Sequence, residues 1–372
     1  MLILLILSVL LINLSTLTGQ EPTIAANHTM MAQAQALAGA GLERALWALD
    51  NPDSPEGVGP TAAAPAPYDG SQSLRVATDT GLLGTFRITI AGAAADQRRV
   101  LAVGLAPAEP GALGQARQEL SATLIRLRFP TPPAGISVRG DLTIGDGVTV
   151  DSSSDGSCGD LAATWSSGAT TRGAGSRLIG RDGDPSTANE ENDIRQQQAA
   201  VDFDGRAFSP AELNALKAVA RVRGTYFRGS TTFDSNRRLP DGLVFVDTVS
   251  GRPVTESTVD GDLPTVDIGD GAAGTAETFR GWIVVNGSLS VSGRVSIQGL
   301  AYALDRFSQT GSATLSGAAV AGHVRSALPS VVDAQPAGGP AVAWNCGAAR
   351  TGAGTIPQRW MVKPGTYREA AG

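Results

Sequence analysis

Residues 136–150 read ISVRGDLTIGDGVTV, and residues 283–297 read IVVNGSLSVSGRVSI. The two stretches align without a gap, and their aliphatic residues match at alternate positions, which is the period of a β-strand. The matched pairs are Ile136 with Ile283, Val138 with Val285, Gly140 with Gly287, Leu142 with Leu289, Ile144 with Val291, Val148 with Val295 and Val150 with Ile297. A third copy, SATLSGAAVAG, covers residues 312–322.

Short strands with glycine corners at this spacing are typical of a β-solenoid, in which each coil buries its inward row against the next coil. One coil cannot bury its own face, so we expect the segments near 136 and 283 to stack despite their separation in sequence. A plain β-sandwich made of hairpins is the alternative interpretation of the same pattern.

Other local signals fill in the body of the protein. Ser209, Pro210 and Glu212 form a capping-box pattern that predicts a helix near 209–223, with Gly224 after its end. Alternation in 84–90 and 98–105 predicts a β-hairpin. Residues 112–120 could be helical or lead into a strand over 119–129, and the sequence leaves this open.

The N-terminus is strongly apolar. MLILLILSVLLINL covers residues 1–14, and a helix continued to Thr18 would be about 27 Å long, close to the thickness of a bilayer core. Residues 24–49 carry small or apolar residues every three or four positions and no proline, so we expect one long helix to residue 50 with a kink at Pro22. A membrane anchor followed by a surface helix is the competing interpretation.

These patterns predict an α+β protein: a long N-terminal membrane and stalk helix, then a β-rich body with solenoid-like rungs and one short capping helix. The expected divisions are a stalk helix over 1–50, a linker over 51–67 rich in Pro and Ala, a hairpin-containing region over 68–130 and a Gly-rich domain over 131–372. The net charge of −6 offers no basic stripe, so nucleic acid is not an expected partner.

A family resemblance rests on the N-terminal residues. Glu21, Ile24, Ala25, Ala26 and Asn27, followed by Ala38-Gly39-Ala40-Gly41-Leu42-Glu43, resemble the signature of PilX-type pilus assembly proteins, with Gly39 where the family usually has Glu. The closing Tyr367-Arg368-Glu369 is similar to the ending that many members share.

The resemblance implies a minor pilin-like subunit of a type IV pilus or pseudopilus. Its implied partners are other pilin-like subunits, contacted through the N-terminal helix, and the bacterial inner membrane before assembly. The body would then lie in the periplasm and later on the extracellular pilus, where it could serve adhesion to a surface ligand of unknown identity. The helix residues expected to serve the membrane and assembly are Leu2, Leu5, Val9, Ile12, Glu21, Pro22, Ile24, Asn27, Ala38, Gly41 and Leu42. A short basic leader ending in Gly is expected upstream of Met1.

Residues for catalysis are sparse. The two histidines are His28, in the predicted stalk, and His323, which would need a distant partner for a Ser-His-Asp site. Asp141 and Asp146 fall where corners are expected, the usual place for Asp. We therefore expect a noncatalytic protein without a cofactor; the alternative is a membrane-tethered extracytoplasmic solenoid that binds or cleaves carbohydrate.

An acidic loop and two cysteines complete the candidates. In residues 182–193, Asp182, Asp184 and Asp193 occupy calcium-ligand positions of an EF-hand-like loop, but Thr187 stands where Gly is needed, so a solvated loop is the favoured interpretation. Cys158 and Cys346 would form a disulfide if the chain lies outside the cytoplasm; two separate buried thiols are the alternative.

Overall fold

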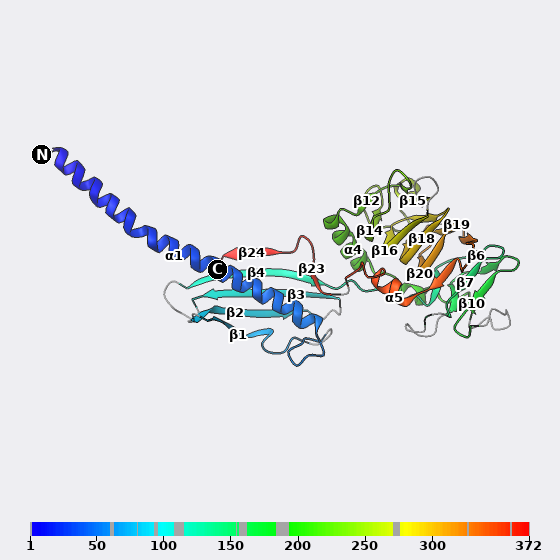
Figure 1. The fold of residues 1–372 in the computed structure, drawn as a ribbon, viewed down its shortest axis with the longest axis horizontal. Coiled ribbons are helices and arrows are strands. Elements are labelled where there is room, and N and C mark those ends of the chain that lie inside the picture. Colours follow the sequence, from blue (N-terminus) through cyan, green and yellow to red (C-terminus); the bar gives the residue numbers. More distant parts are fainter. Residues whose placement is uncertain are drawn as a thin grey trace. The chain divides into compact units, whose positions relative to one another are not determined.

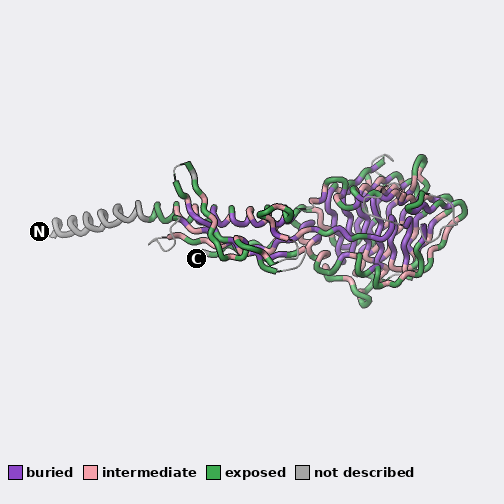
Figure 2. Tube along the Cα trace, turned by 90° about the horizontal axis from the view of Figure 1, so that it is seen from below, coloured by how far each residue is buried: buried purple, intermediate pink, exposed green. Residues whose placement is uncertain are grey.

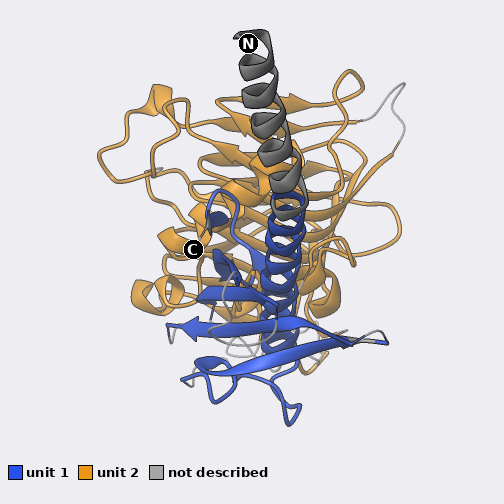
Figure 3. Cartoon of the chain, turned by 90° about the vertical axis from the view of Figure 1, so that its left-hand side faces the viewer, with its two compact units in different colours: residues 1–126, 359–372 blue, residues 127–358 orange. Residues whose placement is uncertain are grey.

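A computed structural model describes residues 2–59, 63–79, 81–92, 96–107, 115–153, 155, 162–183, 193–270, 276–325, 327–357 and 359–371; the side chains of 2–23, 78 and 371 lie outside this description. The chain divides into two compact units (Figure 3). Unit 1 comprises residues 1–126 and 359–372, and unit 2 comprises residues 127–358. The last fourteen residues therefore belong to unit 1, whereas the sequence pattern placed them with the Gly-rich body.

Unit 1 is a long helix on an antiparallel sheet. Helix α1 (Leu2–Asp50) packs against the sheet through its C-terminal third (Figures 1 and 2). The sheet runs in the order β1 (Asp69–Thr78), β2 (Gly81–Ala91), β3 (Gln97–Ala106) and β4 (Ala116–Ile125), and both β23 (Met361–Val362) and β24 (Arg368–Ala371) pair with β4. Strands β2 and β3 pair antiparallel, so the predicted hairpin is confirmed. Residues 116–125 are a strand, which decides the segment that the sequence left open.

Unit 2 is built on two large parallel sheets, and its largest hydrophobic cluster draws on the strands of both. The first sheet runs in the order β12 (Tyr226–Arg228), β14 (Gly242–Asp247), β16 (Glu277–Val285), β18 (Val295–Ala303) and β20 (Thr314–Ala321). Beyond β20 it divides into two branches. One branch holds β5 (Ala134–Val138), β8 (Ala162–Ser166) and β11 (Ile194–Arg195), and the other holds β22 (Val342–Trp344), β7 (Thr149–Asp151) and β10 (Arg177–Ile179). The second runs β13 (Thr231–Phe233), β15 (Thr265–Ile268), β17 (Ser288–Val291), β19 (Phe307–Gly311), β21 (Ser330–Ala334), β6 (Leu142–Ile144) and β9 (Thr170–Arg172).

The chain does not build this stack in sequence order. It enters at β5, runs outward to β11, and starts again at the opposite end with β12. From there it returns strand by strand until β20 pairs with β5, placing Ala319 beside Ile136. Helices α3 (Ala200–Asp204) and α4 (Pro210–Arg223) lie in the crossing segment, the short 3-10 turn η2 (Asp260–Asp262) precedes β15, and α5 (Cys346–Thr351) follows β22.

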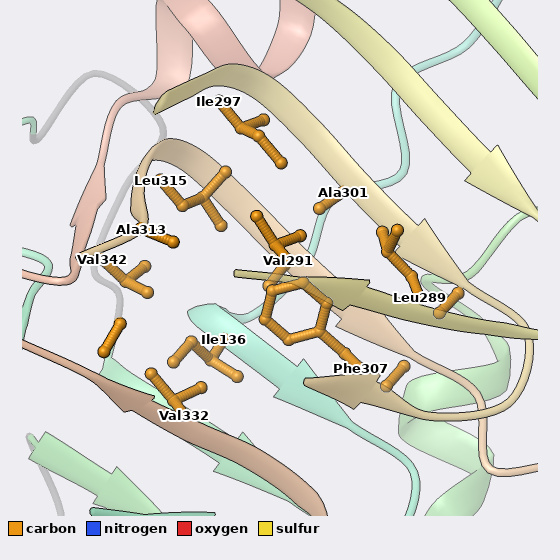
Figure 4. Packing of buried hydrophobic residues seen from close by; sticks show 14 of the residues in the cluster. Ile136, Leu289, Val291, Ile297, Ala301, Phe307, Ala313, Leu315, Val332 and Val342 are labelled. Carbon is orange, nitrogen blue, oxygen red and sulfur yellow. The ribbon is translucent and has the colours of Figure 1, made fainter. Parts of the chain in front are cut away.

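The sequence repeat lies in register across this stack. Ile136 pairs with Ala319, Ala319 with Ala301, and Ala301 with Ile283, so the matched isoleucines share one column with two strands between them. The same holds for Val150 and Ile297, through Val342 and Leu315. The segments near 136 and 283 thus belong to one stack without being direct neighbours. Figure 4 shows Ile136, Ile297 and Leu315 among the buried side chains of this core.

Helix α4 follows its predicted local chemistry. The Ser209 hydroxyl accepts from the Glu212 N–H, the Glu212 carboxylate accepts from the Ser209 N–H, and Gly224 ends the helix in the left-handed conformation. The capping-box prediction is confirmed. Leu216, which the sequence placed on the apolar stripe, is buried.

The predicted fold class was wrong. Within its described residues the structure has four α-helices, not a stalk and one capping helix, and it is mostly β with large parallel sheets. Helices α3 and α5 span five and six residues, too few for an apolar period to show in the sequence. Among the residues whose side chains the structure describes, which in α1 begin at Ile24, no helix is long and apolar enough to cross a membrane.

Candidate functional site

The C-terminal third of α1, residues 34–50, packs on the sheet of its own unit and is here called the docked stretch. Its buried residues recur every three or four positions, the helical period, and they are Ala34, Leu37, Ala38, Leu42, Ala45, Ala48 and Leu49. Small residues bring the helix very close to the strands: a Cβ added to Gly104 would lie 2.0 Å from the Ala34 carbonyl oxygen. Ala38, Gly41 and Leu42, predicted to serve assembly, are thus buried within this unit.

The preceding stretch of α1, residues 24–33, is here called the projecting segment. It lies beyond the buried stretch that begins at Ala34, and most of its residues are exposed (Figure 2). Ile24 is 52% exposed and Met31 is 41% exposed, and Asn27 also faces solvent. Large apolar side chains on one exposed helical segment are a feature of surfaces that bind a partner.

Other predicted helix residues lie farther toward the N-terminus. The backbone of α1 is helical through Pro22 and back to Leu2. The side chains of Leu2, Leu5, Val9, Ile12, Glu21 and Pro22 fall outside the described residues, so their proposed roles stay predictions.

The C-terminal segment of the chain forms hydrogen bonds with the docked stretch of α1. The Trp360 N–H donates to the Asp50 carboxylate at 2.8 Å, at the end of the helix. The Gln35 amide donates to the Glu369 carboxylate at 3.1 Å. Arg44 forms an ion pair with Glu56, and its guanidinium carbon lies 4.5 Å from the centroid of the Trp47 ring. The Gln35 and Asp50 contacts tie α1 to the C-terminal segment, whereas the Arg44 ion pair joins the helix to the loop that follows it.

The structure describes two of the three cation-site candidates. Asp182 is exposed, Asp193 is buried and accepts the Gly180 N–H at 2.5 Å, and Asp184 falls outside the described residues. In the described ranges, no group of three or more His, Cys, Asp or Glu side chains could hold a metal ion.

The disulfide prediction reaches a residue that is not described. Cys346 is buried at the start of α5, and its N–H donates to the Asp155 carboxylate at 2.7 Å. Cys158 lies outside the described residues. The pairing of the two cysteines therefore stays a prediction.

His323 lies next to a serine. Its Nε2 lies 2.9 Å from the Ser330 hydroxyl, but Ser330 has no exposed surface and its hydroxyl also accepts the Phe307 N–H at 3.1 Å. A nucleophile must reach its substrate, so this pair has the geometry of a structural contact. The corner aspartates are likewise braces: Asp141 accepts the Ala169 N–H at 2.8 Å, and Asp146 accepts the Ala174 N–H at 2.7 Å.

The sequence patterns did not predict one buried polar cluster in unit 2. The fully buried Asp247 carboxylate contacts Lys217 of α4, Tyr226 and Asn286. Two signals mark it in the sequence: Lys217 is one of only two lysines, and Asp247 ends the apolar strand GLVFVD.

The similarity of this chain to known proteins is slight. No family model matches the chain, and no curated protein matches it. Among solved structures, it is similar to the crystal structure of the competence-associated pilin ComZ from Thermus thermophilus, at 9% sequence identity, over 92% of this chain and 98% of that chain, with a TM-score of 0.24. A likeness at this TM-score carries no argument about function. The PilX resemblance finds no support from a family model.

Proposed function

We propose that this chain is a noncatalytic, pilin-like subunit whose projecting segment packs against the equivalent helix of another pilin-like subunit. The supporting observation is that α1 has a docked stretch, residues 34–50, which packs on its own sheet, and a projecting segment in which Ile24 and Met31 are exposed. An isolated chain gains nothing from exposing these side chains, whereas burial contributes about 25 cal/mol for each Å² of apolar surface removed from water.

A helix is the partner that fits this segment best. Residues 24–27 read IAAN, and residues 32–34 read AQA, so small side chains flank the exposed Ile24 and Met31. Small residues let two helix backbones approach closely, and the larger side chains then fill the grooves of the partner. Farther toward the N-terminus, residues 1–14 include eleven Leu, Ile or Val, which extends the apolar character of the same helix.

In this proposal the protein works outside the cytoplasm, by association and display. Unit 1 supplies the helix that joins like subunits, and unit 2 supplies the exposed body. The docked stretch of α1 would transmit load through the Asp50 to Trp360 contact, because Trp360 directly precedes β23, which pairs with β4 of the sheet. Helping filament assembly and contacting a surface are the tasks that this arrangement serves.

Site-specific photocrosslinking in the native cell tests the proposal. A photoreactive phenylalanine analogue replaces Ile24 or Met31 in the full chain, and the matched control replaces Val222 of α4, which is 73% exposed. We expect adducts from positions 24 and 31 to pilin-like subunits, and none of these from position 222. Adduct yields equal to those at position 222 would contradict the proposal, as would a mature protein that is secreted alone and begins beyond Ala34.

A further inference from the structure

Asp247 is the centre of a buried polar cluster in unit 2 that the proposed function does not use. The carboxylate has no exposed surface, and the side chain of Lys217 is only 14% exposed. The Lys217 Nζ contacts the Asp247 Oδ2 and also donates to the Gly251 carbonyl oxygen at 2.7 Å. The Tyr226 hydroxyl donates to the same Oδ2 at 2.9 Å.

The other oxygen of this carboxylate holds an amide. The Asn286 Nδ2 donates to the Asp247 Oδ1 at 2.8 Å, and the Thr248 N–H donates to the same atom at 3.0 Å. Strand pairing places the two side chains together, because Val246 and Val285 are partners, Asp247 is the last residue of β14 and Asn286 directly follows β16. A primary amine and a side-chain amide therefore lie on the two oxygens of one carboxylate.

As an ion pair, this cluster is expensive to keep. Removing an ammonium and a carboxylate from water is unfavourable for each ion, and a buried pair often fails to recover that cost. The Asn286 Oδ1 is also buried, and it has no hydrogen-bond partner among the described residues. A reaction that removes both charges without breaking the packing would lower the free energy of this site.

We propose that Lys217 and Asn286 join in an intramolecular isopeptide bond, with Asp247 as the proton relay. Asp247 takes a proton from the Lys217 ammonium through Oδ2, which leaves a neutral amine. The amine nitrogen attacks the Asn286 Cγ, and a new carbon–nitrogen bond forms. The relay moves one proton from the attacking nitrogen to the Asn286 Nδ2, the old carbon–nitrogen bond breaks, and ammonia leaves.

The atoms and charges balance without a co-reactant. An ammonium, a carboxylate and a primary amide become a secondary amide, a neutral carboxylic acid and ammonia. The buried ion pair disappears, and the protonated Asp247 remains as a hydrogen-bond donor. The product would link α4 covalently to the end of β16, an attachment suited to a body that bears load.

Intact mass spectrometry of the full chain, after reduction of any disulfide, tests this proposal. We expect a mass lower than the sequence mass by one ammonia, and a proteolytic digest that contains a branched peptide joining residues 217 and 286. The Lys217→Arg variant keeps the positive charge beside Asp247 but has no amine to form this bond, so it should show the full mass. The matched control Lys363→Arg changes the only other lysine and should keep the loss of ammonia.

Three results would overturn the proposal. The first is a wild-type chain with the full sequence mass, which decides the matter even if Lys217→Arg fails to fold. The second is a loss of ammonia that persists in Lys217→Arg, which would identify a cyclic imide at Asn286-Gly287. The third is a loss of water with a peptide joining residues 217 and 247, which would place the bond on Asp247.

Discussion

Gly104 of β3 lies directly beneath the backbone of α1 at Ala34. A Cβ at position 104 would stand 2.0 Å from the Ala34 carbonyl oxygen and 2.6 Å from the Ala38 nitrogen. Both neighbours are backbone atoms of a continuous helix, which cannot rotate away as a side chain can. The close approach of helix and sheet in unit 1 thus depends on a glycine in the strand.

The Gly104→Ala substitution should therefore weaken the packing of the docked stretch of α1 on the sheet. Overpacking of this kind costs up to about 3 kcal/mol, and we expect faster amide hydrogen exchange over residues 34–50. Gly39→Ala is the matched control, because a Cβ there meets nothing within 4 Å. In a helix that change should be neutral or stabilise by about 0.5–1 kcal/mol. Equal exchange rates in the two variants would contradict the interpretation.

The first sheet of unit 2 contains a column of three glycines. Gly281, Gly299 and Gly317 are register partners on adjacent strands. Gly299 has a φ of +147°, and a Cβ there would lie 1.8 Å from the Gly281 carbonyl oxygen. Both the backbone conformation and the space exclude a side chain.

We expect Gly299→Ala to destabilise unit 2 by about 3 kcal/mol, since strain and overpacking both contribute. Denaturant unfolding followed by tryptophan fluorescence, to which the buried Trp165, Trp282 and Trp344 of unit 2 contribute, measures the change. Gly339→Ala is the control because nothing lies within 4 Å of an added Cβ. An unchanged unfolding midpoint for Gly299→Ala would show that the sheet can bend elsewhere.

The hydroxyl of Tyr302 should make stability depend on alkaline pH. Burial raises the pKa of Tyr302, whose ring lies 4.8 Å from that of Phe208. The folded state therefore holds the proton more tightly than the unfolded state, whose tyrosine pKa is about 10. The stabilising contribution is complete below pH about 10 and is lost as pH rises toward the folded-state pKa.

Tyr302→Phe should flatten the decline in unfolding free energy above pH about 10. Tyr367→Phe serves as the control, because Tyr367 is 47% exposed and solvent screens its contribution. Chemical unfolding at a series of pH values gives both profiles. If the Tyr302→Phe profile is as steep as that of the wild type, another group controls the alkaline transition.

The link between Cys158 and Cys346 is a separate prediction. Closing so long a loop would stabilise the fold by up to roughly 5 kcal/mol in the chain-entropy model. Nonreducing mass spectrometry of the exported protein should recover a peptide pair containing both cysteines. Two free thiols would remove the prediction and favour separate buried residues.

The sequence by itself determined the local chemistry. The capping box at Ser209 and Glu212 specified α4, because its hydrogen bonds join residues three apart. The alternation in 84–90 and 98–105 specified β2 and β3 in the same way. The gapless repeat even specified register, since Ile144 and Val291 share a column through Val332 and Gln309.

Only the tertiary structure decided the order of the parallel strands and the surroundings of the buried charges. Parallel strands can pair across any separation in sequence, so nothing local says that β5 meets β20 and that β16 lies two strands further away. The same holds for Lys217, Asp247 and Asn286, which the packing of α4 on adjacent strands brings together. Patterns report interactions between near neighbours along the chain, and these contacts arise only when distant segments bury their surfaces against each other.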